Sequence, residues 1–363
     1  MLLVRRHPAD ELSGIRGPSL RTNGRDLVIQ AVIGEISNPI GRANPYRIGT
    51  DGVPRILPGP GGIVLNRRIG DHCVGLAVDH VEPGVSLRNH QRGVGVGAAD
   101  GPNLALMTSA CVGNAARVVT GPCRGATGIV TGKHGGVNHV LVDFDTRILS
   151  NLVIGDRVQV YSCGLGLQLL DHPDITVSNC SPGMLRRWNP TQRGGALEVR
   201  VTHVMPAAII GSGRGQNAVS RADFDIELFD ARVRRRFGLD TLRFGDLVCV
   251  CDADSRFGFS ARNGRITVGI IAHSESTVAG HGPGVVTLLT GSASRIRPIF
   301  DRNANIAALY ERRSLVPRQH RTPVAGRTRF SVRVPPTARR DLRLDAPKRV
   351  RHRAHIVNKW PRS

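Results

Sequence analysis

The sequence has no apolar run that approaches the roughly 18 residues a membrane-spanning helix requires. Residues 1–6 contain too short an apolar stretch for a signal peptide. We therefore expect a cytoplasmic protein with no membrane partner. Aromatic residues make up only 4% of the chain, and no basic run in its body alternates with aromatics, as a platform for stacking nucleic-acid bases requires.

Cysteine pairs with metal-binding spacing are also missing. The seven cysteines form no CxxC pair, the spacing typical of zinc and thiol-redox motifs. Their odd number and scattered positions favour free thiols in a cytosolic, disulfide-free protein. Cys249 and Cys251 alternate within an apolar run, so we expect them to be small core residues of one strand.

Negative charge is scarce, and the net charge is +22. Residues 311–363 hold 16 Lys and Arg against three acids, and thus 13 of the 22 excess positive charges. This segment is rich in Arg and Pro, has no sustained apolar face and is predicted to be disordered. It is either a dispensable extension or an arm that binds nucleic acid or another polyanion.

Turn residues are abundant, since the chain has 43 glycines and 22 prolines. Short β-branched runs bounded by turn residues predict strands at 27–33, 128–131, 140–144, 197–201 and 266–271. Helical periodicity is limited to short pieces, at 103–116 and 231–237. The predicted fold class is mainly β, a β-rich α+β chain with two β-sandwich or small-barrel-like domains, short helices and a disordered basic tail.

A cluster of proline and glycine between residues 182 and 195 predicts a domain boundary. We expect an N-terminal extension at 1–26 and a β-rich domain at 27–190 that carries most candidate site residues. A second barrel-like domain at 196–310 and the tail at 311–363 would follow.

A Gly-Asp pair before an apolar run occurs three times, with its aspartates at Asp71, Asp156 and Asp246. Glycine permits the left-handed backbone that opens such a turn, and the aspartate can accept hydrogen bonds from nearby main-chain amides. We therefore interpret these aspartates as structural residues that start strands, and not as catalysts.

Three glycine-rich segments contain the histidines and acids best suited to chemistry. In the first, Asp79, His80 and Glu82 precede a Pro-Gly turn, so two carboxylates and an imidazole lie within a few residues. Such a group suits general acid/base work or metal ligation. A hydrogen-bonded turn with solvated acids would explain the same residues without a function.

The second segment, at 131–144, contains a Lys-His-Gly-Gly turn followed by a strand. His134 lies in the turn, and His139 is expected on the strand face opposite the core. Lys133 is the only lysine in the first 347 residues of an arginine-dominated chain. Its ammonium could hold a substrate carboxylate or phosphate, or act as a base if desolvated. A surface hairpin tip is the alternative interpretation.

The third segment, at 270–284, contains two histidines. His281 is flanked by glycines and followed by proline, a stiff loop that would fix its imidazole against open backbone, so we expect it in a site. His273 ends a buried-looking strand, and we interpret it as a satisfied core histidine.

Two weaker signals complete the candidates. Gly211, Ser212 and Gly213 resemble a phosphate-binding loop in which Arg214 could clamp an anion, although the Lys-Ser/Thr of a P-loop is absent. Cys111 lies among small residues at a possible turn into a helix. It is either an activated nucleophile or, more simply, a buried small thiol.

The chain resembles the bacterial and archaeal family called domain of unknown function 4438. The motifs, in order, are Pro-Gly-Pro-Gly-Gly at 58–62, Asp-His-Val-Glu-Pro-Gly at 79–84, Cys-Val-Gly-Asn at 111–114, Gly-Lys-His-Gly-Gly at 132–136, Gly-Ser-Gly at 211–213 and Gly-His-Gly-Pro-Gly at 280–284. The resemblance covers residues 27–308 and excludes the tail. It implies a β-rich, two-part architecture and supplies no activity.

The residues predict a small-molecule enzyme whose turns bring distant groups to one cleft. The candidate ligands of a divalent metal ion, zinc or a similar ion, are His80, Glu82, His134, His139 and His281. Asp79, Lys133 and Cys111 are the candidate catalytic groups, and an anionic substrate would suit Lys133. Hydrolysis of an amide or related carbonyl compound is the most economical reaction, with a lyase or isomerase as alternatives. A polyanion-binding protein, a scaffold without chemistry and a homo-oligomer also stay open.

Overall fold

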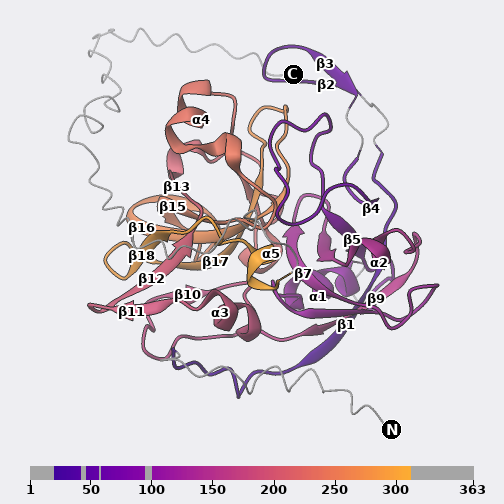
Figure 1. Ribbon diagram of the computed structural model, residues 1–363, viewed down its shortest axis with the longest axis horizontal. Coiled ribbons are helices and arrows are strands. Elements are labelled where there is room, and N and C mark those ends of the chain that lie inside the picture. Colours follow the sequence, from indigo (N-terminus) through magenta and orange to yellow (C-terminus); the bar gives the residue numbers. More distant parts are fainter. Residues whose placement is uncertain (1–19, 42–45, 57–58, 95–99, 312–363) are drawn as a thin grey trace, which may run out of the picture. The chain divides into compact units, whose positions relative to one another are not determined.

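The computed structural model describes residues 20–41, 46–56, 59–94 and 100–311 (Figure 1). All described residues belong to one compact unit. The predicted basic tail, apart from Glu311, lies outside the described residues. In the part of the chain that is described, no helix is both long and apolar enough to cross a membrane.

Seven strands of the N-terminal half form one sheet, in the order β1-β9-β6-β7-β8-β5-β4. They are β1 (Gln30–Ile36), β4 (Ile63–Val64), β5 (Gly84–Arg88), β6 (Ala115–Val118), β7 (Thr127–His134), β8 (His139–Asp143) and β9 (Arg157–Ser162). A further antiparallel pairing of β1 with β5, at Glu35 with Arg88 and Ile36 with Leu87, closes six of these strands into a barrel. Buried aliphatic side chains such as Leu87, Val130 and Val160 share one hydrophobic cluster there.

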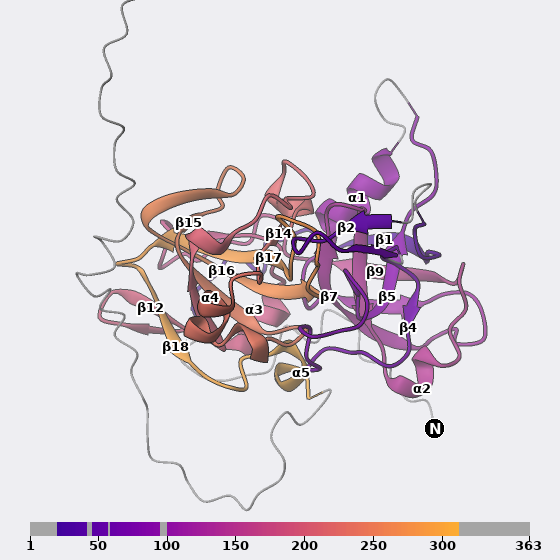
Figure 2. The same cartoon turned by 90° about the horizontal axis from the view of Figure 1, so that it is seen from above.

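The C-terminal half is built on a second sheet, in the order β10-β17-β16-β15-β13, with β14 also paired to β17. Its strands are β10 (Thr176–Val177), β13 (His203–Pro206), β14 (Phe224–Asp225), β15 (Leu247–Asp254), β16 (Ser260–His273) and β17 (Gly284–Ser292). Figure 2 labels the strands β14, β15, β16 and β17 of this sheet. A three-stranded sheet contains β11 (Thr191–Arg193), β12 (Ala196–Val201) and β18 (Ile296–Phe300), and a hairpin contains β2 (Tyr46–Ile48) and β3 (Pro54–Ile56).

The helices are few and short. The α-helices are α1 (Gly101–Ser109), α2 (Thr146–Leu149), α3 (Pro182–Trp188), α4 (Ala231–Phe237) and α5 (Ile306–Leu309), and the 3-10 helices are η2 (Ala207–Ile209), η3 (Val219–Arg221) and η4 (Leu239–Thr241). The prediction of a mainly β chain with short helices is therefore confirmed. The predicted division into two domains is not tested by these elements and stays a prediction.

The predicted helix at 103–116 is wrong in its extent. Helix α1 ends at Ser109, and the chain continues into strand β6 from Ala115. Between them Gly113 has a left-handed φ of 85°, and the Asn114 side chain accepts a hydrogen bond from the main chain of Cys111 at 2.7 Å. This turn satisfies main-chain groups that a continuing helix would have used.

The three Gly-Asp pairs have the structural role that the sequence predicts. Asp71, Asp156 and Asp246 each accept a hydrogen bond at 2.9 Å from the main-chain N–H three residues earlier. Strand β9 begins directly after Asp156, and β15 begins directly after Asp246. The carboxylates therefore fix the turns that lead into these two strands.

The barrel and the second sheet meet where β7 packs against β16. A methyl group on Gly132 of β7 would lie only 2.7 Å from Cβ of Ala272 in β16, so only glycine allows this approach. His134 and His273 end these same two strands. The close packing therefore brings two histidines from distant parts of the chain to one place.

Candidate metal centre

Four imidazoles and two carboxylates converge where β7 and β16 end. The six residues are His80, His134, Asp223, Asp225, His273 and His281. The ring centroids of His134 and His273 are 4.2 Å apart. His80 lies next to them, with its ring centroid 5.6 Å from that of His134 and 5.2 Å from that of His273, and 5.5 Å from that of His281.

Two of these imidazoles are oriented by carboxylates behind them. Nδ1 of His134 lies 2.5 Å from Oε1 of Glu82, and Nδ1 of His80 lies 2.7 Å from Oδ2 of Asp79. An ionised carboxylate can only accept, so each Nδ1 carries the proton that it donates. The lone pair of a neutral ring is then on Nε2.

The other two imidazoles are oriented by main-chain carbonyls. Nδ1 of His273 lies 3.0 Å from the carbonyl oxygen of Ser274, and Nδ1 of His281 lies 3.0 Å from that of Ala279. Carbonyl oxygens also only accept, so Nδ1 is again the donor. All four rings thus use Nδ1 for an outer hydrogen bond and keep Nε2 for the centre of the cluster.

The main chain holds both aspartates in place. Oδ1 of Asp223 accepts a hydrogen bond from Gly135 N–H at 2.8 Å, which turns Oδ2 toward Nε2 of His273 at 2.8 Å. Oδ2 of Asp225 accepts from Gly282 N–H at 3.2 Å. The distances from Asp225 to two imidazoles are longer, 3.5 Å from Oδ1 to Nε2 of His273 and 3.8 Å from Oδ2 to Nε2 of His80.

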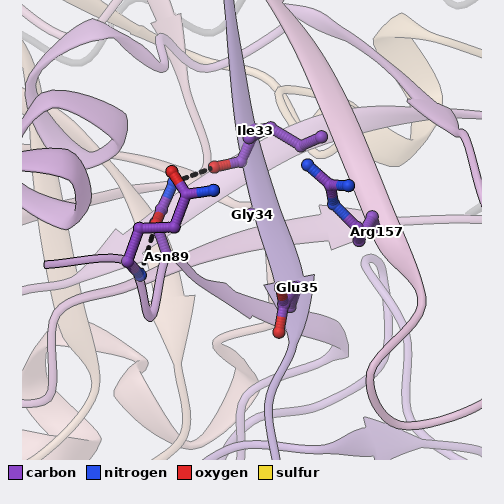
Figure 3. A pocket seen from close by; sticks show the side chains of 6 residues that line it. Ile33, Gly34, Glu35, Asn89 and Arg157 are labelled. Atoms are coloured by element: carbon purple, nitrogen blue, oxygen red, sulfur yellow. Dashed lines mark hydrogen bonds between the residues drawn. The ribbon is translucent and has the colours of Figure 1, made fainter.

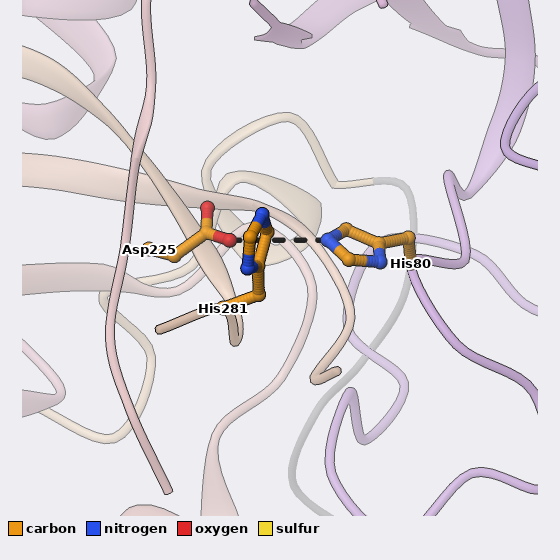
Figure 4. A group of neighbouring side chains, drawn as sticks. All are labelled: His80, Asp225 and His281. Atoms are coloured by element: carbon orange, nitrogen blue, oxygen red, sulfur yellow. Dashed lines mark ion pairs between the residues drawn. The ribbon is translucent and has the colours of Figure 1, made fainter. Parts of the chain in front are cut away.

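Two groups of three residues have the spacing of metal ligands. One is His134, Asp223 and His273, and the other is His80, Asp225 and His281 (Figure 4). In each group the ligand atoms lie within 4.8 Å of one another. Imidazole nitrogens and carboxylate oxygens are suitable ligands for zinc and similar divalent ions, so these groups could hold a metal.

Three acids in or behind the cluster, Glu82, Asp225 and Asp79, have lowered pKa values. Burial would raise the pKa of Glu82, but hydrogen bonds from His134 and His139 outweigh it and hold that pKa well below its usual range. The pKa of Asp225 is lowered in the same way, against its burial, by His273 and His80. Asp79 also has a lowered pKa, because hydrogen bonds from His80, Ser276 and Thr277 outweigh its burial.

The pKa values of two imidazoles are shifted in the opposite direction, upward. Burial would lower the pKa of His80 and of His273, yet both values are raised by hydrogen bonds to carboxylates. Asp225 and Asp79 act on His80, and Asp223 and Asp225 act on His273. The carboxylates therefore attract positive charge to this centre, whether a proton or a metal ion supplies it.

The structure brings His80, His134 and His281 together, as the sequence interpretation requires. Glu82, expected as a ligand, lies behind the cluster with both oxygens engaged, one by His134 and the other by Nδ1 of His139 at 2.9 Å. Nε2 of His139 faces Ser37 Oγ at 3.3 Å. Glu82 and His139 are thus placed to support the ligands, and not to bind an ion. Asp79, expected as a base, supports His80 in the same way.

Lys133 is fully buried and has protein partners for its ammonium. Nζ donates to Asn179 Oδ1 at 2.7 Å and to the carbonyl oxygen of Ser220 at 2.5 Å. Burial lowers its pKa to about 8. The ammonium ties β7 to the segment that precedes Asp223, so it is placed for supporting that segment and not for holding a substrate in the open.

Cys111 is also buried, at 2% exposure. Burial raises the pKa of its thiol, which disfavours the thiolate that nucleophilic attack requires. Among the described residues it belongs to neither group of potential ligands. All seven cysteines of the chain are free thiols.

The loop containing Gly211, Ser212 and Gly213 supports the cluster through its main chain. Gly213 N–H donates to Gly280 at 2.9 Å and its carbonyl accepts from Asp225 at 2.9 Å. Arg214 instead lies over the ring of Phe259, 5.5 Å from its centroid. The loop therefore packs beside the centre, while the arginine is engaged elsewhere.

Sequence reasoning missed three of the six residues. The sequence predicts a core histidine at His273, and the residue is fully buried, but its ring also faces Asp223 and Asp225. The missed signal for the aspartates was the alternation Asp-Phe-Asp at 223–225. In an extended segment this pattern puts both carboxylates on one face and the phenyl ring on the other.

A small hollow on the barrel shares no lining residue with this centre (Figure 3). It is lined by Ile33, Gly34, Glu35, Asn89, Gln91 and Arg157. Asn89 donates its side-chain amide to the carbonyl oxygen of Ile33 at 3.0 Å. No histidine or cysteine lines the hollow, so it does not resemble a metal site.

Comparisons with known proteins give the family. The N-terminal model of the domain of unknown function DUF4438 matches residues 46–186, and its C-terminal model matches residues 187–310. A solved structure titled "Crystal structure of TM1086" is 39% identical with a TM-score of 0.73, and the match covers 79% of this chain and 98% of that one. The search of curated proteins found no match. The resemblance inferred from the motifs is therefore confirmed.

Proposed function

The chain belongs to the family of domain of unknown function 4438, and from the geometry of its histidines we propose that it is a metal-dependent hydrolase. Its substrate would be a small molecule with an amide or related carbonyl group. The ion would be zinc or another divalent ion that accepts both imidazole and carboxylate ligands.

One observation carries the proposal. The four imidazoles of the cluster all donate Nδ1–H to an oxygen behind them, which leaves four Nε2 atoms for the centre. Metal-ligating histidines almost always donate their other ring N–H to a carboxylate or carbonyl, because this fixes the tautomer and raises the basicity of the ligand. Histidines that only fill a core do not need Nδ1 as the outer donor, so core packing alone does not explain four rings with this orientation.

The chemistry of such a centre favours hydrolysis. When bound, a divalent cation supplies a Lewis acid and makes water reactive near neutral pH. The residues of the chain then have three tasks. The Nε2 atoms, Asp223 and Asp225 would bind metal, in one or both of the two groups of ligands. Asp79 orients His80 and Glu82 orients His134. The partly exposed His80 and His281 form the side that a substrate would reach. The free thiols of the chain support action in the cytoplasm.

Metal content and turnover test the proposal together. The untagged protein should contain zinc or a similar ion by elemental analysis, and should cleave members of a panel of amides and esters. A chelator should abolish the turnover, and the metal should restore it. Asp225→Asn, which keeps the shape of the side chain, should lose metal and activity. His90→Ala, at an exposed histidine outside the cluster, should retain both. Protein that binds no metal after incubation with Zn²⁺, Mn²⁺ or Co²⁺ would refute the proposal.

A further inference from the structure

Asp225 lies between the two groups of potential ligands. Its Oδ1 lies 3.5 Å from Nε2 of His273, which belongs to one group, and its Oδ2 lies 3.8 Å from Nε2 of His80, which belongs to the other. Two ligand atoms of one tetrahedral zinc ion lie about 3.4 Å apart, given bond lengths of roughly 2.1 Å. Each oxygen of Asp225 is therefore spaced from a different imidazole about as two ligands of the same ion would be.

The acids in and behind the cluster have, when ionised, a larger formal charge than one divalent ion neutralises. Four carboxylates are buried in or directly behind the cluster, at 7% exposure for Asp79, 1% for Glu82, and 4% each for Asp223 and Asp225. In the described part of the chain, the ion pairs of these four acids are formed with histidines only, and none with Lys or Arg. The formal charge of four ionised carboxylates equals in size that of two divalent cations.

The two groups differ in their access to solvent. All three members of the group formed by His134, Asp223 and His273 are buried. In the other group Asp225 is buried, whereas His80 and His281 are partly exposed. An ion in the first group would be enclosed by protein, and an ion in the second would be open on one side.

We propose that the cluster binds two divalent cations, an inner ion held by His134, Asp223 and His273 and an outer ion held by His80, Asp225 and His281, with Asp225 bridging them. This inference rests on the proposed function and specifies its metal centre. Asp223 and His273 are at hydrogen-bond distance, 2.8 Å, so the inner ion replaces the proton between them. The outer ion faces the substrate and exchanges faster.

Stoichiometry tests the assignment. The full-length chain is stripped with chelator, incubated with Zn²⁺ or Mn²⁺, desalted and analysed for metal. We expect two ions per chain for the wild type and for His90→Ala, and one for His281→Ala and for His281→Gln, with folding checked by circular dichroism. The Mn²⁺ form of the wild type should give the electron paramagnetic resonance spectrum of a spin-coupled pair, and both His281 variants that of an isolated ion. A chelator should remove the outer ion of the wild type much faster than the inner ion.

The possible failures can be told apart. One ion per wild-type chain would overturn the two-ion centre and leave the hydrolase proposal standing. No bound ion would overturn both. Two ions per chain in both His281 variants, or two ions released at one rate, would overturn the assignment of an open outer site.

Discussion

Glu82 and His134 form a hydrogen bond of 2.5 Å between Oε1 and Nδ1, and both side chains are buried. This contact decides which nitrogen of the imidazole is available, because the ring has only one other. The second oxygen of Glu82 is engaged by His139 and by the hydroxyl of Ser86. Glu82 therefore supports the centre without facing it, and its charge would act on a bound ion through the ring of His134.

We predict that Glu82→Gln weakens metal binding by about 10- to 100-fold, the usual effect of removing a carboxylate behind a ligating histidine. The amide retains the volume but not the charge. The affinity is measured by competition with a chromophoric chelator. The matched control is Glu198→Gln, at a glutamate paired with Arg297 outside the cluster, which should leave the affinity unchanged. Equal affinities in Glu82→Gln and the wild type would show that Glu82 does not act on the metal.

Gly284 gives a second test of the inner group. A Cβ atom at this position would overlap Nε2 of His273 and lie 2.5 Å from Oδ2 of Asp223. Gly284→Ala should therefore cost about 1–3 kcal/mol of unfolding free energy and lower the metal content. Gly41→Ala is the control, because no atom of the described residues lies within 4 Å of its added methyl group. Urea denaturation measures the loss of stability, and elemental analysis measures the metal content. A normal metal content in Gly284→Ala would contradict the inner site.

Much of the fold could be predicted because its signals are local. The runs at 140–144 and 197–201 alternate β-branched residues between turns, and they form β8 and β12 within one residue of the predicted bounds. The Gly-Asp turns were also predictable, since the carboxylate and the amide it accepts from lie three residues apart. Closure of the barrel was not predictable, because it depends on the pairing of Ile36 with Leu87 across 51 positions.

The candidate site was predictable only in part, for the same reason. His80, His134 and His281 have glycine or proline nearby, which marks them as unusual in the sequence. His273 has no glycine or proline directly beside it, and an ordinary core residue would be buried in a strand in the same way. Only the tertiary contact with Asp223, 50 positions away, distinguishes the two interpretations. The outer hydrogen bonds of the four rings depend on backbone geometry that no periodicity encodes.

The stability of the fold at acid pH should depend on Asp254. Hydrogen bonds from Arg256 lower the pKa of this carboxyl, and Arg265 lies 3.3 Å away. Because the folded-state pKa lies below the unfolded value of 3.8, the unfolded state binds more protons as the pH falls below about 4. The contribution of Asp254 is therefore present above that pH and is lost as the pH falls through the folded-state value.

Asp254→Asn should lower the unfolding free energy at pH 7 by about 1 kcal/mol, and its loss of stability between pH 5 and pH 2 should be smaller than that of the wild type. Urea denaturation at several pH values measures both quantities. Asp26→Asn, at an exposed aspartate, should follow the wild-type curve. If Asp254→Asn lost as much unfolding free energy between pH 5 and pH 2 as the wild type, the arginines would not act on this carboxyl.

Metal removal should destabilise the whole fold, because the centre joins β7 and β14 to β16 and to two loops. A ligand that binds only the folded state contributes RT ln(1 + [L]/Kd), which is about 4 kcal/mol at 1,000 times Kd. Without an ion, the buried carboxylates of Asp223 and Asp225 keep the main-chain amides of Gly135 and Gly282, and imidazolium rings are their only cationic partners among the described residues. The midpoint of thermal unfolding should therefore fall by several degrees when the protein is stripped, and return when Zn²⁺ is added. Asp225→Asn should respond less to Zn²⁺ than His90→Ala does. A midpoint that is the same with chelator and with excess Zn²⁺ would mean that the convergence of these side chains is a protonated histidine network and not a metal centre.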